Sequence, residues 1–213
     1  MKQFLLFTLI FILPALISCS CDYTTESVLE CYAKTGYLPS GYDLKLWDLA
    51  SCEESLLQKL FDMGECPTRD DVRGLHFDGI VNYVKFDTLG RAVFELFIHD
   101  FDVLSDKLVT PALSFQKRFY TQTDSEGRDG TNFWSYAHEQ MYRMKTYVSP
   151  AVQNKSYNSL KIDYTVPGNN VLTTQPLLDE IRRIKGSDIF VGKMYFRVAG
   201  EPVFILWFSL EQR

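Results

Sequence analysis

Most signatures of enzymes and nucleotide-binding proteins are missing from this chain of 213 residues. It contains no GxSxG nucleophile elbow, no phosphate-binding loop, no GxGxxG fingerprint and no HExxH zinc motif. Only three histidines occur, and His76, His99 and His138 are too far apart in the sequence to match a metal-binding spacing. The sequence therefore identifies no reaction, and it indicates no metal and no cofactor.

Clusters of basic residues are also missing. The formal net charge is −5, and the lysines and arginines are spread along the chain. We therefore expect neither a nucleic-acid partner nor adsorption to anionic lipid headgroups by charge. The chain has no internal repeats, and its length suits one domain or one domain with an extension.

The clearest pattern that is present lies at the start of the chain. Lys2 is followed by the apolar run Phe4 to Leu13, which Pro14 interrupts, and small residues follow at Ala15 and Ser18. This order is typical of a signal peptide, here residues 1–18. The apolar stretch of about 14 residues is shorter than the roughly 20 that a membrane-spanning helix requires. We therefore expect the protein to be exported.

A second signal overlaps the end of this segment. Leu16-Ile17-Ser18-Cys19 resembles the bacterial lipobox, in which the cysteine becomes an acylated N-terminus. The resemblance implies a lipid anchor at Cys19, which makes the membrane a partner, and Ser20 after it favours the outer membrane of the cell envelope. Ordinary cleavage after Ser20 is the alternative, and it would release a secreted soluble protein.

Cysteine is absent after residue 66, so residues 19–66 form a separate lead-in before the domain of residues 67–213. An even number of remaining cysteines in an exported chain predicts two disulfides, with the pairing left open. The four cysteines concerned are Cys21, Cys31, Cys52 and Cys66. The lead-in also contains a predicted helix near residues 53–63, with a capping-box spacing at Ser51 and Glu54 and a stop at Gly64.

After residue 67 the apolar residues follow the two-residue period of strands. Residues 133–148 fit a helix or a strand, and we favour a strand because their neighbours are strands. The segments that alternate are residues 75–82, 92–99 and 160–166. Near the end, Phe190–Val198 and Val203–Leu210 flank Ala199-Gly200-Glu201-Pro202, a hairpin signal. Seven or eight strands predict a sandwich or an antiparallel up-and-down barrel.

The last predicted strand is apolar on both faces, with Phe204, Leu206 and Phe208 alternating with Ile205 and Trp207. A strand of this kind needs cover on both sides. We expect the helix near residues 53–63 to cover its outer face, because burial against the same chain is the usual solution.

The C-terminal part resembles a group of uncharacterised small proteins from bacteria and fungi. The matching pieces lie between residues 115 and 210, in the same order as in that group, although Thr165 stands where serine is usual. They are Gln116–Phe119, Asp163–Asn169, Asp179–Arg182, Asp188–Gly192 and Phe204–Phe208. The resemblance implies a mainly β protein with a single calycin-like or lipocalin-like barrel, and it implies no activity.

Charged residues within apolar strand sequence are the candidate site. Asp163 and Tyr164 lie in one predicted strand, residues 160–166, and Glu180 and Arg182 lie in the next, residues 178–185. Consecutive strands are usually neighbours, so alternation predicts Asp163 opposite Arg182 as a cross-strand ion pair. Charges that face the interior must pair, because an unpaired buried charge is very costly. Such a pair could orient the polar end of a ligand; the alternatives are a structural ion pair and residues that face solvent.

These features favour an exported protein that binds a small apolar ligand in a barrel cavity. One alternative is an enzyme of the same architecture that uses Asp163, Glu180 or a histidine as acid or base. Another is a structural envelope lipoprotein with a filled core. An open interior would distinguish the first two from the third.

Overall fold

The fold is described from a computed structural model, which describes residues 24–85, 114–134 and 140–213. The signal-peptide and lipobox residues with Cys19, and also Cys21, lie outside these ranges, as does the strand predicted over residues 92–99.

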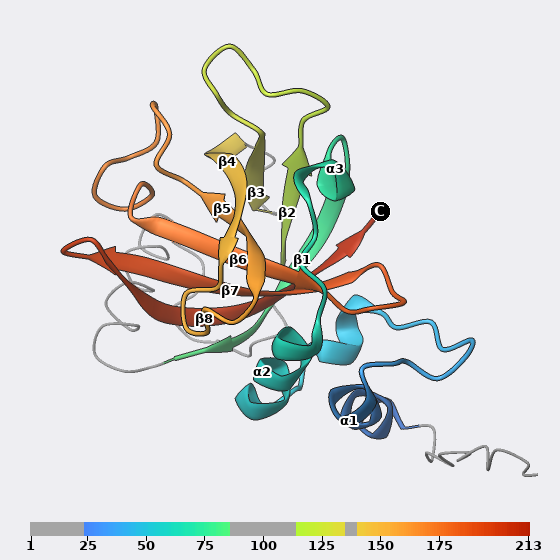
Figure 1. The fold of residues 1–213 in the computed structure, drawn as a ribbon. Helices are drawn as coiled ribbons and strands as arrows, with labels where there is room; N and C mark the ends of the chain where they lie inside the picture. Colours follow the sequence, from blue (N-terminus) through green and yellow to red (C-terminus); the bar gives the residue numbers. More distant parts are fainter. Residues whose placement is uncertain (1–23, 86–113, 135–139) are drawn as a thin grey trace, which may run out of the picture.

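In the described residues, eight antiparallel strands close into a barrel in sequence order (Figure 1). Each strand pairs with the next along the chain, and β8 closes the barrel against β1. The strands are β1 (His76–Val84), β2 (Ser114–Phe119), β3 (Gly130–Trp134), β4 (Gln140–Pro150), β5 (Asn158–Asp163), β6 (Leu177–Arg183), β7 (Ile189–Val198) and β8 (Glu201–Gln212). The prediction of a mainly β, up-and-down barrel is confirmed, and the described residues of the ambiguous stretch 133–148 are strand.

The predicted C-terminal hairpin is also confirmed. Strands β7 and β8 are joined by Ala199 and Gly200, whose φ angles are both positive, at 52° and 91°. Two positive φ angles are what a two-residue hairpin turn requires, because this geometry matches the twist of the flanking strands. The sequence placed Glu201 and Pro202 in the turn, whereas they begin β8.

Short helices precede the barrel. They are α1 (Thr25–Thr35), the 3-10 helix η1 (Leu46–Leu49), α2 (Glu54–Met63) and α3 (Arg69–Val72). Helix α2 ends before Gly64 as predicted, but its N-cap is Glu53, so the capping box expected at Ser51 is wrong. Among the described helices, none has both the length and the hydropathy needed to span a membrane.

Helices α1, η1 and α2 form an outer layer against the barrel wall, and Figure 1 shows α1 and α2 together on one side of the barrel. Phe61 of α2 packs edge to face on Trp207 of β8, with ring centroids 5.8 Å apart. Asn82 of β1 donates from Nδ2 to the Leu49 carbonyl at 2.9 Å. The expected helix cover of the last strand is therefore confirmed.

The disulfides expected in this layer are not confirmed. Cys31, Cys52 and Cys66 are free thiols in the structure, and each is partly buried. Burial raises the pKa of Cys52 to about 11, which keeps this thiol protonated and unreactive near neutral pH. In the described residues, apolar contacts and the hydrogen bonds of the outer layer hold the extension to the barrel.

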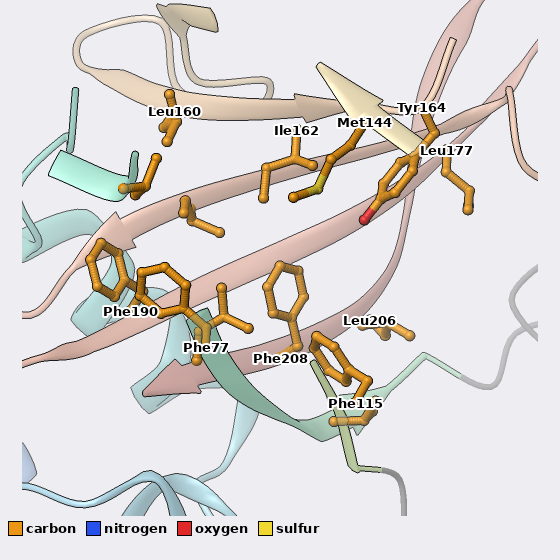
Figure 2. Packing of buried hydrophobic residues seen from close by; sticks show 14 of the residues in the cluster. Phe77, Phe115, Met144, Leu160, Ile162, Tyr164, Leu177, Phe190, Leu206 and Phe208 are labelled. Atoms are coloured by element: carbon orange, nitrogen blue, oxygen red, sulfur yellow. The ribbon is translucent and has the colours of Figure 1, made fainter. Parts of the chain in front are cut away.

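The barrel interior contains a cluster of apolar side chains (Figure 2). The ring of Phe77 meets those of Phe119 and Phe190 edge to face, at centroid distances of 5.5 and 5.2 Å. Gly192 makes room for Phe208, because a Cβ atom at this position would overlap the Phe208 ring. Side chains therefore fill this part of the interior.

Burial changes along the barrel axis. On β7, Phe190 is buried, whereas the inward-facing Met194 and Phe196 are partly exposed. On β4, Met144 is fully buried and Tyr142 is partly exposed. Partly exposed lining residues therefore occur toward the end of the barrel that carries the β7–β8 turn, and Leu75 is partly exposed at the other end.

Candidate functional site

Three polar side chains meet inside the barrel, and we call Lys117, Tyr164 and Asp179 the inner trio. Lys117 lies on β2, Tyr164 follows β5, and Asp179 lies on β6. Strand pairing sets Lys117 opposite Phe77 and Asp179 opposite Ile162, and both of these partners belong to the inner apolar cluster. Directly paired residues on neighbouring strands lie on the same face of the sheet, so Lys117 and Asp179 also point inward.

The inner trio is closely hydrogen-bonded. Lys117 Nζ donates to Asp179 Oδ2 at 2.9 Å, to the Tyr164 hydroxyl at 2.6 Å and to Asn132 Oδ1 at 3.4 Å. The Tyr164 hydroxyl donates in turn to the same Asp179 oxygen at 2.8 Å. The side chains of Lys117 and Asp179 are only 2% and 3% exposed. This is a buried ion pair with one tyrosine as a third member.

Aromatic rings surround the amine. Lys117 Nζ lies 5.2 Å from the ring centroid of Phe115, 5.4 Å from that of Tyr164 and 5.3 Å from that of Phe208. Rings at this distance attract a cation through their quadrupole. Figure 2 shows the Tyr164 hydroxyl pointing into the core, toward the space between Met144 and Phe208. The inner trio thus combines charged groups with an apolar surrounding.

Burial has the expected effects on these groups. It lowers the pKa of Lys117, and the nearby Asp179 carboxylate offsets this only in part. Burial also raises the pKa of Tyr164 well above its ordinary value, and Asp179 adds to this effect. Tyr164 therefore remains a protonated hydrogen-bond donor under all physiological conditions.

One carboxylate oxygen of the inner trio has no hydrogen-bond partner among the described residues. Asp179 Oδ2 accepts two hydrogen bonds, but Oδ1 is buried and has no hydrogen-bond partner among the described residues. Buried polar atoms nearly always have a partner, so an exception calls for an explanation. The inner trio can accept one more hydrogen bond from a donor that the described residues do not supply.

A second trio of the same chemistry lies on the outer face of the wall, and we call Lys161, Glu180 and Tyr195 the outer trio. Glu180 Oε1 accepts from the Tyr195 hydroxyl at 2.6 Å. Its Oε2 accepts from the Val152 amide and the Ser159 hydroxyl, both at 3.0 Å, and from Lys161. Glu180 is fully buried, and its two carboxylate oxygens share four donors.

The environment of Glu180 favours its charged form. Burial by itself raises the pKa of Glu180, but Lys161 and the hydrogen bonds outweigh this and hold the pKa below the ordinary 4.5. Every donor to this carboxylate comes from the chain. We interpret the outer trio as structural.

Two more cations beside the outer trio attach the cover to the wall. Lys193 donates to Gln58 Oε1 of α2 at 2.8 Å and to Gln153 Oε1 of the β4–β5 connection at 2.6 Å. Its Nζ also lies 4.7 Å from the ring centroids of both Phe61 and Trp207. Lys193 thus holds the helix and the connection to the same point of β7.

Arg182 attaches the same two segments. Its guanidinium donates to the carbonyls of Gly64, which follows α2, and Asn158, which begins β5. It lies 4.2 Å from the ring centroid of Tyr157. Arg182 therefore contacts covering segments and not the barrel interior.

The structure separates the four residues that the sequence placed in one site. Of these four, Tyr164 points into the barrel, whereas Asp163, Glu180 and Arg182 lie on the outer face. The predicted pairing of Asp163 with Arg182 is wrong, because the register sets Asp163 opposite Leu178. Asp163 instead pairs with Arg197 of β7 at 3.1 Å.

Sequence reasoning missed three members of the inner site, namely Lys117, Asn132 and Asp179. A signal for Lys117 was present, since it lies two residues from both Phe115 and Phe119 in a strand and must share their face. Asn132 and Asp179 carried no such signal, because their inward direction depends on which strands pair.

Other polar groups in the described residues do not form a comparable site. His76 is exposed at the start of β1, whereas His99 and His138 lie outside the described ranges. Asp129 borders a recess of about the size of one water molecule, but Arg69, Thr123 and Thr146 bond both of its oxygens. No group of three metal-binding side chains occurs among the residues with a described position.

Comparisons of this chain with family models, with curated proteins and with solved structures found no match.

Proposed function

We propose that the protein is an exported, lipid-anchored envelope protein that binds a small apolar molecule inside its barrel. The observation that carries the binding proposal is the contrast between the two trios. The outer trio is complete, whereas Asp179 Oδ1 of the inner trio has no donor among the described residues and lies in an aromatic-lined interior. Binding sites for small molecules typically combine an apolar lining with a few polar groups that fix orientation.

The described lining suggests how such a molecule would enter. The inward side chains are partly exposed near Met194, Phe196 and Tyr142, toward the end with the β7–β8 turn. Asp179 pairs directly with Met194 in the register of β6 and β7. Methionine is unbranched and adapts its shape easily, so its movement could open a path to the carboxylate.

The enzyme alternative receives less support. Of the residues suggested for acid–base roles, Glu180 is covered by the chain and bonded through both oxygens, and Asp163 pairs with Arg197 on the outer face. A general acid or base must reach a substrate within hydrogen-bond distance. A filled structural core is the stronger rival, because Phe208 and its neighbours pack part of the interior.

Binding can be tested with the neutral fluorescent probe N-phenyl-1-naphthylamine on the purified mature protein. We expect saturable binding of one probe per chain. Met194→Trp should weaken this binding at least about tenfold, because added bulk occupies the lining. Val198→Trp is the matched control, since Val198 is an exposed residue of the same strand. A folded wild-type protein that binds no probe would instead support the filled structural core.

The anchor can be tested separately. We expect the mature chain to begin at Cys19, with the mass of its lipid, and to remain in the membrane fraction. Cys19→Ala should release the protein from the membrane, because bacterial anchors need several acyl chains for stable binding. Cys21→Ala should leave it anchored. A Cys19→Ala protein that stays fully in the membrane fraction would exclude the lipobox interpretation.

We also infer that the exported protein forms two disulfides among its four remaining cysteines. Export to an oxidising compartment and the even number of cysteines support this, and each bridge would contribute about 2–4 kcal/mol. A thiol count on the denatured, unreduced mature protein should find no free thiol. Four free thiols would overturn the inference. The cysteines concerned are Cys21, Cys31, Cys52 and Cys66.

A further inference from the structure

The hydrogen bonds of the inner trio restrict which ligand head group can bind. An ammonium has three donors and no acceptor. All three protons of Lys117 are in use, on Asp179, Tyr164 and Asn132. The single Tyr164 proton is on Asp179. Neither donor can serve a ligand without giving up a present bond.

The only buried acceptor of the inner trio that lacks a partner in the described residues is Asp179 Oδ1. A carboxylate oxygen accepts hydrogen bonds and, when ionised, donates none. A ligand that satisfies this atom must therefore bring a donor. An ether or an ester, which only accepts, would leave Oδ1 unsatisfied and would gain no bond from the site.

Charge narrows the choice further. The positive Lys117 and the negative Asp179 balance each other within the inner trio. A ligand carboxylate would add a second anion beside Asp179, and a ligand ammonium would add a cation near Lys117. Like charges in a buried site repel strongly because no water screens them. A neutral head group avoids both costs.

We infer that the ligand carries a neutral hydrogen-bond donor, such as the hydroxyl of a long-chain alcohol, which donates to Asp179 Oδ1. This inference rests on the proposed binding function and names its ligand class. The apolar part of the ligand lies against the aromatic side of the interior, near Phe115 and Phe208.

Four ligands with the same ten-carbon chain test this inference by displacement of N-phenyl-1-naphthylamine from the mature protein. They are 1-decanol, decyl methyl ether, decanoate and decylamine. We expect 1-decanol to bind at least about tenfold more tightly than each of the others, because a hydrogen bond to a charged acceptor is among the stronger ones. Equal affinity for the ether, or preference for decanoate or decylamine, overturns the inference while leaving the binding function intact.

Asp179→Asn provides the second arm. The amide nitrogen of asparagine can occupy the place of Oδ1 and donate, so an ether becomes acceptable there. The preference for decanol over the ether should fall to about twofold or less in this variant. An unchanged preference in folded Asp179→Asn would overturn the inference. Failure of every ligand and of the probe to bind folded wild-type protein would instead remove the binding function, and this inference with it.

Discussion

Two neighbouring residues of β6, Asp179 and Glu180, lie at the centres of trios with the same chemistry on opposite faces of one wall. Each carboxylate is buried with a lysine and a tyrosine. The outer trio is enclosed by the chain's own donors. The inner trio leaves one carboxylate oxygen without a donor in the described residues. The two trios differ in whether both carboxylate oxygens accept hydrogen bonds, and not in whether their charges are buried.

This difference shows why a buried ion pair alone is weak evidence for function. Buried pairs are found as structural elements and are costly to break from one side. The outer trio serves as an internal reference, since Val152 and Ser159 complete it from the adjacent β4–β5 connection and β5. The inner trio faces a barrel interior in which no such covering segment is described.

The largest effect on stability should come from the outer trio. Glu180→Leu removes the acceptor of four donors and leaves Lys161 as an unpaired buried cation. We expect a loss of about 4 kcal/mol or more in the free energy of unfolding, measured with urea. Glu65→Leu is the control, because Glu65 pairs with Lys185 at the surface and such pairs contribute less than about 1 kcal/mol. Similar losses in both variants would contradict a structural role for the outer trio.

The inner trio should behave differently when both charges are removed. Lys117→Met alone strands Asp179 and should cost about 3 kcal/mol. Adding Asp179→Leu should recover stability to within about 2 kcal/mol of wild type, because an apolar pair can replace a buried ion pair and only the Tyr164 hydroxyl and Asn132 Oδ1 lose partners.

The matching double variant of the outer trio, Lys161→Met with Glu180→Leu, should recover much less. It leaves the Val152 amide, the Ser159 hydroxyl and the Tyr195 hydroxyl without their acceptor. Urea denaturation of both double variants makes the comparison direct. Equal recovery in the two would show that the trios are energetically alike.

A smaller effect is expected from pH. The pKa of Glu180 lies below its ordinary value of 4.5 in the folded protein. Its contribution to stability is therefore complete above that ordinary value and is lost as the pH falls through the lowered pKa. One such proton changes the free energy of unfolding by at most about 1.4 kcal/mol per pH unit. Glu180→Gln should show a shallower loss of stability on acidification than wild type, and parallel curves would contradict the assignment.

Local patterns in the sequence predicted the strands and the C-terminal hairpin but left a sandwich or a barrel open, and the choice of a single barrel came from the family resemblance. Alternation in Phe204–Leu210 and the Ala199-Gly200 turn are visible without knowing which strands pair. Cover of the outer face of β8 by α2 followed from the two apolar faces of that strand. The export signal and the lipobox stay predictions, because residues 1–23 lie outside the described residues.

The candidate site was harder to predict because it depends on register. The expected pairing of β5 with β6 differs from the observed one by four residues, because Asp163 lies opposite Leu178 and not opposite Arg182. Asp179 and Lys117 are 62 positions apart in the chain, and only closure of the barrel brings them together. Local periodicity gives the face of a residue within its strand, but it does not give the partner across the barrel.

The most direct test of the account observes both carboxylates at once. The side-chain carboxyl carbons of Asp179 and Glu180 can be followed by carbon-13 NMR, with assignments from Asp179→Asn and Glu180→Gln, while 1-decanol is added. We predict that the Asp179 signal moves with a saturable dependence on decanol, because Oδ1 gains a donor, while the Glu180 signal stays in place. Saturable binding of decanol with an unmoved Asp179 signal, or with equal movement of both signals, would contradict it.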